Sequence, residues 1–290
     1  MIITNKLNLP EAFVRATSSD DHKFEPMRFS VTELLLPTKQ IVLQREHFDE
    51  IKEDVADRIP AMIGTAIHAL LEKLAPENVE TESKIESQFD QFTLAGKIDC
   101  LIVDDQEIDD YKSCSVSKVM KKDFQDWLNQ GLMYALLVYL KRNIIIRKFK
   151  IYALMKDWSK LKANCSADYP QSAIYVWEYN IQDSDYDYIT TFIKNKFNEI
   201  QLAMMSHNQL ECTDEERWYT GTKYAVYKKA GDLKAAKVFD TEEEAHQFIT
   251  EKCNGTGEIQ VRPGEYLKCK YYCNAKEFCN QGDQNETING

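Results

Sequence analysis

Residues 94–113 read "LAGKIDCLIVDDQEIDDYKS", and this stretch decides the fold of the protein. Its first part continues an alternation of apolar and polar residues that begins at "KIESQFDQF" (84–92), and such alternation predicts β-strands. The acidic run that follows predicts a turn, and "EIDDYKSC" (107–114) predicts another strand. We therefore expect a pair of strands across 84–105, a turn, and a third strand at 107–114.

The position of each charge along these strands decides which charges can meet. Side chains on a strand alternate between its two faces, so Asp110 and Lys112 share a face while Asp109 points away from them. The same rule predicts that Ile98 is buried and that Asp99 is exposed on the opposite face. An antiparallel pairing of the two strands could bring Asp99 near Asp110. The alternate pair of acid and lysine therefore matters more than the two adjacent acids.

Two carboxylates and an ammonium at one place are what metal-assisted hydrolysis of a phosphodiester needs. Carboxylate oxygens are ligands for Mg²⁺ or Mn²⁺. The metal neutralises charge on the phosphate and lowers the pKa of a water, and a lysine can orient that water or stabilise the charge that develops. Taken alone, however, Asp110-x-Lys112 is a common triplet that more often marks a solvated strand edge.

Helices and further strands surround this stretch. A helical pattern at 60–74 places Ile63, Ile67, Leu70 and Leu74 on one face. The order of helix, three strands, helix, two strands and helix predicts an α/β or α+β core with a mixed sheet. The other predicted elements are helices at 30–36 (capped by Ser30, with Glu33 three residues later), at 124–143 and from Asp183 or Ser184 to about 206, and strands at 148–158 and 172–181.

Three polar residues on the predicted helices could join the site. His68 lies on the helix at 60–74; such a histidine is usually an interfacial residue, but a neutral imidazole could also ligate the metal. Gln130 and Tyr134 are four residues apart and share a helix face. They are either an ordinary polar pair or an amide and a phenol that bind a phosphate or position the lysine.

In this order the motifs resemble the PD-(D/E)XK nuclease superfamily, over roughly residues 60–200, and look closest to its RecB-like branch, beside CRISPR-adaptation nucleases and phage-encoded exonucleases. The resemblance implies a restriction-endonuclease-like mixed β-sheet flanked by helices. The second acid is Asp110, where glutamate is more frequent. The implied roles are metal ligation by His68, Asp99, Asp110 and the main-chain carbonyl of Tyr111, catalysis by Lys112, and a helix motif of Gln130 and Tyr134 typical of this branch.

The eight cysteines suggest a second centre. The tail "CKYYCNAKEFC" (269–279) has a spacing that favours metal binding in an intracellular protein. Iron–sulfur members of the superfamily often carry one further cysteine before the core, but residues 1–99 contain none, which leaves Cys212 as the best fourth ligand. Four thiolates suit [4Fe–4S] or Zn²⁺ equally, and only the resemblance favours iron–sulfur. The expected ligands are Cys212, Cys269, Cys273 and Cys279, while Cys100, Cys114, Cys165 and Cys253 are expected to be inert thiols.

Composition bounds the remaining possibilities. A hydrophobic content of 43% in 290 residues allows a large core, and no apolar run reaches the length of about 18 that a membrane span requires. The start of the chain lacks a secretory pattern, so we expect a cytoplasmic protein with reduced thiols. The predicted domains are an N-terminal segment (1–58), a nuclease core (59–211) and a C-terminal appendage (212–290) with a hairpin at 223–240, a capped helix at 241–252 and the cysteine tail.

The leading hypothesis is a Mg²⁺- or Mn²⁺-dependent DNA nuclease, an exonuclease or end-processing enzyme of replication or recombination, which could be phage-encoded and work with a helicase or recombination protein. The alternative is a non-catalytic nucleic-acid-binding or assembly subunit that retains the fold. A third reading is a structural zinc module with an accessory α/β domain. The net charge of −11 argues against binding DNA by bulk charge. We expect instead a local groove lined by Lys118, Lys121, Lys122 and Arg142.

Overall fold

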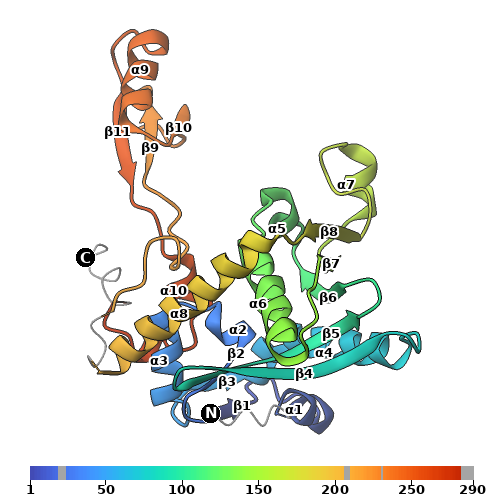
Figure 1. Cartoon of the computed structure of the whole chain (residues 1–290). Helices are drawn as coiled ribbons and strands as arrows, with labels where there is room; N and C mark the ends of the chain where they lie inside the picture. Colours follow the sequence, from blue (N-terminus) through green and yellow to red (C-terminus); the bar gives the residue numbers. More distant parts are fainter. Residues whose placement is uncertain (19–23, 206–209, 230, 282–290) are drawn as a thin grey trace. The chain divides into compact units, whose positions relative to one another are not determined.

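The protein folds as two compact units, each with its own β-sheet. The computed structural model describes residues 1–18, 24–205, 210–229 and 231–281. The first unit is Met1–Gln209 and the second is Leu210–Gly290 (Figure 1). The domain boundaries expected after residues 58 and 211 stay predictions.

The first unit is built on a mixed sheet with the strand order β2-β5-β6-β7-β8, in which β4 also pairs with β5. The pairs β4–β5, β5–β6 and β7–β8 are antiparallel, whereas β2–β5 and β6–β7 are parallel. The strands are β2 (Arg28–Ser30), β4 (Glu80–Phe89), β5 (Phe92–Ile102), β6 (Glu107–Cys114), β7 (Lys148–Met155) and β8 (Ile174–Asn180). The predicted mixed α/β architecture is confirmed, and so are the three consecutive strands.

Strand β5 is the centre of this sheet. Along one edge it pairs with β4, and along the other it pairs with β2 at its start and with β6 at its end. Cys100 therefore lies between Thr81 of β4 and Asp109 of β6. Because Asp99 precedes Cys100, the topology places this acid where three strands meet.

Helices cover the sheet and bury the core. α6 (Gln125–Arg142) packs on β4 and β5, and α8 (Asp183–Met205) packs against α6 and α3 (Thr38–Glu46), with α6 and α8 above β4 in the view of Figure 1. Both long helices agree with their predicted ranges to within one residue at each end. α6 can approach the sheet closely because Gly131 faces Phe149. A Cβ at position 131 would lie 2.2 Å from that ring.

The N-terminal segment belongs to this core. Strand β2 joins the sheet, and Phe29, Val31 and Leu34 are fully buried with it. The predicted cap is confirmed, because Ser30 and Glu33 form a reciprocal capping box at the start of α2. The segment contains β1 (Ile2–Thr4), α1 (Glu11–Ser18), β2, α2 (Val31–Leu34), α3 and β3 (Lys52–Asp54), and β1 pairs with β3 in parallel.

Helix α4 (Val55–Lys73) begins five residues before the predicted start, because Asp54 caps it by accepting a hydrogen bond from the amide of Ala56. Its apolar stripe is present but largely outside the core, since Ile63 is exposed and Leu70 is 58% exposed. The reason is that α4 packs on α1, β3 and β6 instead of lying across the sheet.

The second unit has a small antiparallel sheet in the order β10-β9-β11. Its hairpin and its helix α9, which is capped by Thr241, match the prediction, while the third strand was not predicted. Val226, Ala245 and Ile249 form the buried cluster between sheet and helix. The elements are β9 (Lys223–Tyr227), β10 (Lys237–Phe239), α9 (Glu242–Lys252), β11 (Glu258–Arg262), α10 (Leu267–Tyr271) and the 3₁₀ helix η1 (Lys276–Phe278).

Two short helices complete the first unit, α5 (Val116–Lys121) and α7 (Lys160–Cys165). None of the helices in the described ranges is long and apolar enough to span a membrane.

Candidate active site

The antiparallel pairing of β5 and β6 brings Asp99 and Asp110 together, as predicted. Their register ends at Cys100 opposite Asp109, so the next step along both strands places Asp99 beside Asp110. The amide of Tyr111 donates a hydrogen bond of 2.9 Å to Oδ2 of Asp99. The predicted exposure of Asp99 is wrong. Only 8% of Asp99 is exposed, because β6 and helix α4 both contribute groups that contact it.

Lys112 pairs with Asp110 on the face that strand alternation predicts. Its Nζ lies 2.6 Å from Oδ2 of Asp110, whose carboxylate is almost completely buried, whereas the lysine is partly exposed. Burial raises the pKa of Asp110, and the charge of Lys112 opposes that rise. The lysine is therefore held next to the acid and open to solvent on one side.

Helix α6 holds the other oxygen of the same carboxylate. Nε2 of Gln130 donates to Oδ1 of Asp110 at 3.2 Å and to the hydroxyl of Tyr134 at 3.0 Å. Tyr134 packs over Gly96 so closely that a Cβ at position 96 would lie 2.7 Å from its ring. Both α6 side chains are buried. Gln130 thus contacts the acid and not the lysine, and the expectation of phosphate binding by this pair is not supported by its burial.

His68 approaches the site from α4. Its Nδ1 lies 3.2 Å from Oδ1 of Asp99, and this interaction raises the pKa of His68. The imidazole also meets the ring of Tyr111 edge-on, with 6.1 Å between centroids. Asp99 therefore uses one oxygen for the imidazole and the other for the amide of Tyr111.

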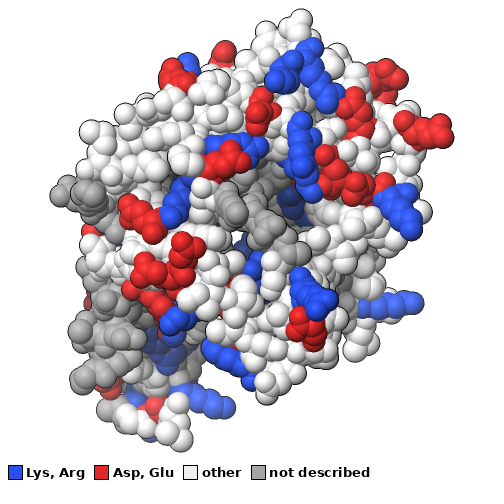
Figure 2. Space-filling model, turned by 90° about the horizontal axis from the view of Figure 1, so that it is seen from below, with Lys and Arg blue, Asp and Glu red and all other residues white. Residues whose placement is uncertain are grey.

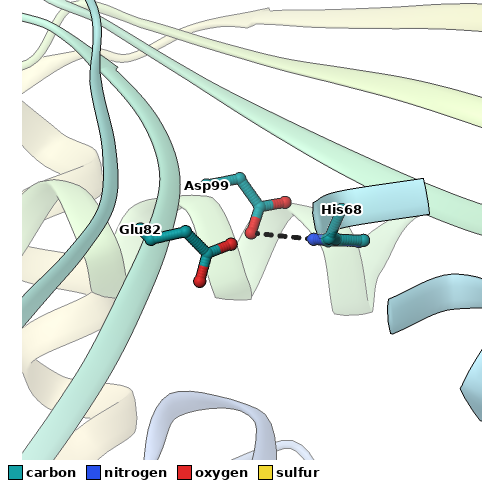
Figure 3. Close-up of side chains that lie close together, drawn as sticks. All are labelled: His68, Glu82 and Asp99. Carbon is teal, nitrogen blue, oxygen red and sulfur yellow. Dashed lines mark ion pairs between the residues drawn. The ribbon is translucent and has the colours of Figure 1, made fainter. Parts of the chain in front are cut away.

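Glu82 is a member of this site that the sequence prediction missed. The ligand atoms of His68, Glu82 and Asp99 all lie within 4.8 Å of one another. Figure 3 shows the Asp99 carboxylate between the imidazole of His68, from α4, and the carboxylate of Glu82, from β4. The predicted strand pair began at Lys84, four residues after the start of β4, and so left out Glu82. Counting back from the β4–β5 turn, Glu82 is the residue opposite Asp99, and that count could have found it.

This donor set fits a hard divalent cation. Carboxylate oxygens with one imidazole nitrogen suit Mg²⁺ or Mn²⁺. In the described part of the chain it is the one group of three His, Cys, Asp or Glu donors whose ligand atoms lie this close together. Asp110 stands next to the group but outside it, because its oxygens face Lys112 and Gln130. Ligation by Asp110 and by the carbonyl of Tyr111 stays a prediction.

The neighbouring acid Asp109 points to the opposite face of β6, as expected. There Glu107 accepts from Lys148 and Lys150, at 2.9 Å and 2.7 Å. Burial and the nearby charge of Glu107 raise the pKa of Asp109 to about 7. Asp109 therefore belongs to a separate cluster.

The four expected cysteine ligands lie in one region of the second unit. Gln281 joins the two ends of this region through two hydrogen bonds to the main chain of Cys212. Its side chain accepts from the amide of Cys212 at 2.9 Å and donates to the carbonyl of Cys212 at 2.8 Å. Burial lowers the pKa of Lys268, and the charges of Cys273, Cys212 and Cys269 oppose that shift. Burial also raises the pKa of Cys273, with a smaller contribution from Cys269 and Cys279. The thiols are neighbours, but among the described residues no three of their sulfurs all lie within 4.8 Å of one another.

Two of the basic residues expected to line a groove pair with acids near opposite ends of α6. Lys118 pairs with Asp126 at the start of α6, and Arg142 pairs with Glu80 at its end, each at 2.7 Å. The two ends of α6 are about 25 Å apart, since a helix rises about 1.5 Å per residue. Figure 2 shows the molecule from below, and on that face basic and acidic side chains are interspersed, so this face has no single basic surface. The groove lined by all four basic residues stays a prediction.

Comparison with known proteins found loose similarity in fold. No family model matches the sequence. No curated protein matches it either. The solved structure of SSO0001 is 16% identical, with a TM-score of 0.47 over 64% of this chain and 83% of that one. A phage-related exonuclease from Haemophilus somnus 129PT is 12% identical (TM-score 0.38; 59% and 83% covered), and an alkaline exonuclease from Laribacter hongkongensis is 9% identical (TM-score 0.39; 61% and 90%). At TM-scores below 0.5, these likenesses do not bear on the reaction at the site.

Proposed function

We propose that the first unit is a metal-dependent DNA nuclease that hydrolyses phosphodiester bonds. The observation that carries the proposal is the junction of β5 and β6, where the buried Asp99 and Asp110 meet beside Lys112. Buried acids that are held by strand pairing, a helix amide and an ammonium form a preorganised site, whereas a solvated strand edge would leave these groups in water.

The residues that would hold the cation are His68, Asp99 and Asp110, with the carbonyl of Tyr111 as a further ligand. A divalent cation bound there would neutralise charge on the phosphate and favour deprotonation of the attacking water. The amide of Tyr111 orients Asp99, and Gln130 orients Asp110. These contacts keep the two carboxylates in place before substrate arrives.

Lys112 would act on the substrate directly. Its ammonium is fixed by Asp110 and is partly open to solvent, so it can contact a phosphate oxygen or the attacking water. A fixed positive charge at that position stabilises the negative charge that develops on the phosphorus oxygens in the transition state. Asp110 is thus both a candidate ligand and the group that positions the lysine.

Purified protein with Mg²⁺ or Mn²⁺ should degrade DNA, and Lys112→Ala and Asp99→Asn should lose turnover while remaining folded. Robust cleavage by both variants would contradict the site. End-labelled linear DNA compared with circular DNA in a time course tests whether the enzyme acts from ends, as an exonuclease of replication or recombination would. If the wild-type protein binds DNA and never cleaves it, the alternative of a non-catalytic subunit is favoured.

We also propose that Cys212, Cys269, Cys273 and Cys279 hold a [4Fe–4S] cluster. The support is that Cys212, Cys269 and Cys273 lie around Lys268 and that Cys279 lies near Cys273. The choice of iron–sulfur over zinc rests on the sequence resemblance, because four thiolates suit either. Absorption spectra and metal analysis of anaerobically purified protein test this. Zinc in place of iron would contradict the cluster, and neither metal would contradict the whole site.

A further inference from the structure

We propose that Glu82 is an additional cation ligand that pairs with Lys97 while no cation is bound, and that Lys97 binds the DNA phosphate once the cation has displaced it from Glu82. The inference rests on the proposed function and concerns the same site. It assigns roles to two residues outside the motifs that suggested a nuclease.

The backbone of Glu82 is the first reason. Register pairing runs from Thr81 opposite Cys100 to Ser83 opposite Ile98, and Glu82 between them is not paired. Its φ is +50°, a left-handed value inside a strand, whereas most strand residues have φ well below zero. A non-glycine residue persists in such a conformation only where its surroundings hold it there. Here the effect is to direct the Glu82 carboxylate toward Asp99 and His68.

The charge balance is the second reason. Glu82 and Asp99 place two carboxylates close together, and their negative charges repel each other. Lys97 forms an ion pair with Glu82 and supplies an opposing charge. A divalent cation among His68, Glu82 and Asp99 would supply that charge more strongly. The ion pair with Lys97 would then be dispensable.

The position of Lys97 is the third reason. Lys97 precedes Asp99 by two residues on β5, so both side chains leave the strand on the same face. Its side chain is 55% exposed, while that of Glu82 is 16% exposed. The residue directly opposite it on β4 is Lys84, so its contact with Glu82 is a diagonal one. Lys97 can therefore leave Glu82 and extend toward solvent, where a phosphate would approach the site.

Cation affinity, measured without DNA, tests the role of Glu82. Calorimetric titration with Mn²⁺ should show at least a tenfold weaker affinity for Glu82→Gln than for the wild type. Glu82→Asn should show the same loss while keeping the unfolding temperature, because asparagine tolerates a left-handed backbone. Glu86 is an acid on the same strand and pairs with Arg28. Glu86→Gln is therefore the matched control and should bind Mn²⁺ like the wild type.

Replacement of Lys97 should weaken the binding of DNA but not the binding of Mn²⁺. Lys97→Met should bind Mn²⁺ at least as tightly as the wild type. In the Lys112→Ala background, which prevents turnover, it should bind an oligonucleotide in the presence of Mn²⁺ at least threefold more weakly than Lys112→Ala alone. Lys84→Met in that background is the control and should leave DNA affinity unchanged.

Unchanged Mn²⁺ affinity in Glu82→Gln would overturn the inference. Weaker Mn²⁺ binding by Lys97→Met would overturn it too, because the ion pair would then support the site instead of competing with the cation. Unchanged DNA affinity in Lys97→Met would remove the phosphate role. These results differ from failure of the proposed function. In that case the wild-type protein would bind Mn²⁺ and cleave no DNA.

Discussion

The acidic site of the first unit and the cysteine region of the second are two candidate metal centres built in different ways. In the first, the donors come from a helix and two adjacent strands, and their ligand atoms already lie within 4.8 Å. In the second, the thiols come from Cys212, the short helix α10 and the turns that follow it, and Gln281 connects the end of the described part of this unit to its start at Cys212.

The difference teaches how a fold prepares a metal site. Strand pairing sets side-chain positions through many main-chain hydrogen bonds, so the carboxylates stay in place without a metal. Short loops supply fewer such constraints, and a bound metal contributes more of the structure around it. We therefore expect loss of metal to leave the first unit folded and to destabilise the cysteine region of the second.

The largest expected effect separates two adjacent acids. Asp110→Asn should reduce cleavage by at least about 100-fold, because it weakens the ion pair that holds Lys112 and removes a candidate ligand. Asp109→Asn should leave cleavage nearly unchanged, since Asp109 lies in a separate cluster on the opposite face. Initial rates on labelled DNA, with circular dichroism to verify folding, measure both. Equal losses in the two variants would mean that strand alternation does not separate their roles.

Substitution of a cysteine tests the cysteine region of the second unit. Cys273→Ser should lose most of the iron or zinc that the wild-type protein carries and should lower the thermal stability of the second unit. Cys165→Ser, at an exposed thiol in the first unit, is the matched control and should keep the metal. Metal content per chain decides the outcome. Full metal in Cys273→Ser would remove that residue from the site.

Two glycines test how tightly the acidic site is held. Gly96→Ala forces a methyl group to within 2.7 Å of the Tyr134 ring, which should cost about 1–3 kcal/mol of unfolding free energy. Movement of Tyr134 should disturb Gln130 and so Asp110, and reduce cleavage roughly 10-fold. Gly64→Ala should leave cleavage intact and not lower stability, since the nearest atom to its Cβ is Ser113 Oγ at 3.6 Å. Urea unfolding and initial rates of both variants provide the measurements.

The smallest expected effect concerns DNA binding by the basic residues around α6. If Lys121 contacts one phosphate, Lys121→Ala should reduce the magnitude of the slope of log K against log salt concentration by up to about 0.9. Arg142→Ala should change that slope little, because Arg142 pairs with Glu80 at the opposite end of α6 from Lys118. Anisotropy titrations at several salt concentrations measure the slopes. A larger effect for Arg142 would support the single groove that the sequence suggested.

Periodicity was enough to predict most of the fold. Alternation along 84–114 predicted β4, β5 and β6, and helical spacing predicted α6 and α8, because these patterns follow from the geometry of each element. Alternation also predicted the shared face of Asp110 and Lys112 and the separate position of Asp109. It did not predict β2, whose pairing partner lies more than 60 residues away along the chain.

The sequence by itself determined which residues are available for chemistry and which of them share a strand or helix face, since both depend on local geometry. Only the tertiary structure decided that Asp99 is buried, that Glu82 joins it, that Gln130 contacts Asp110, and that Lys118 and Arg142 are far apart. Each of these facts depends on contacts between different elements. Their positions are set by packing and long-range strand register, which no short window of sequence contains.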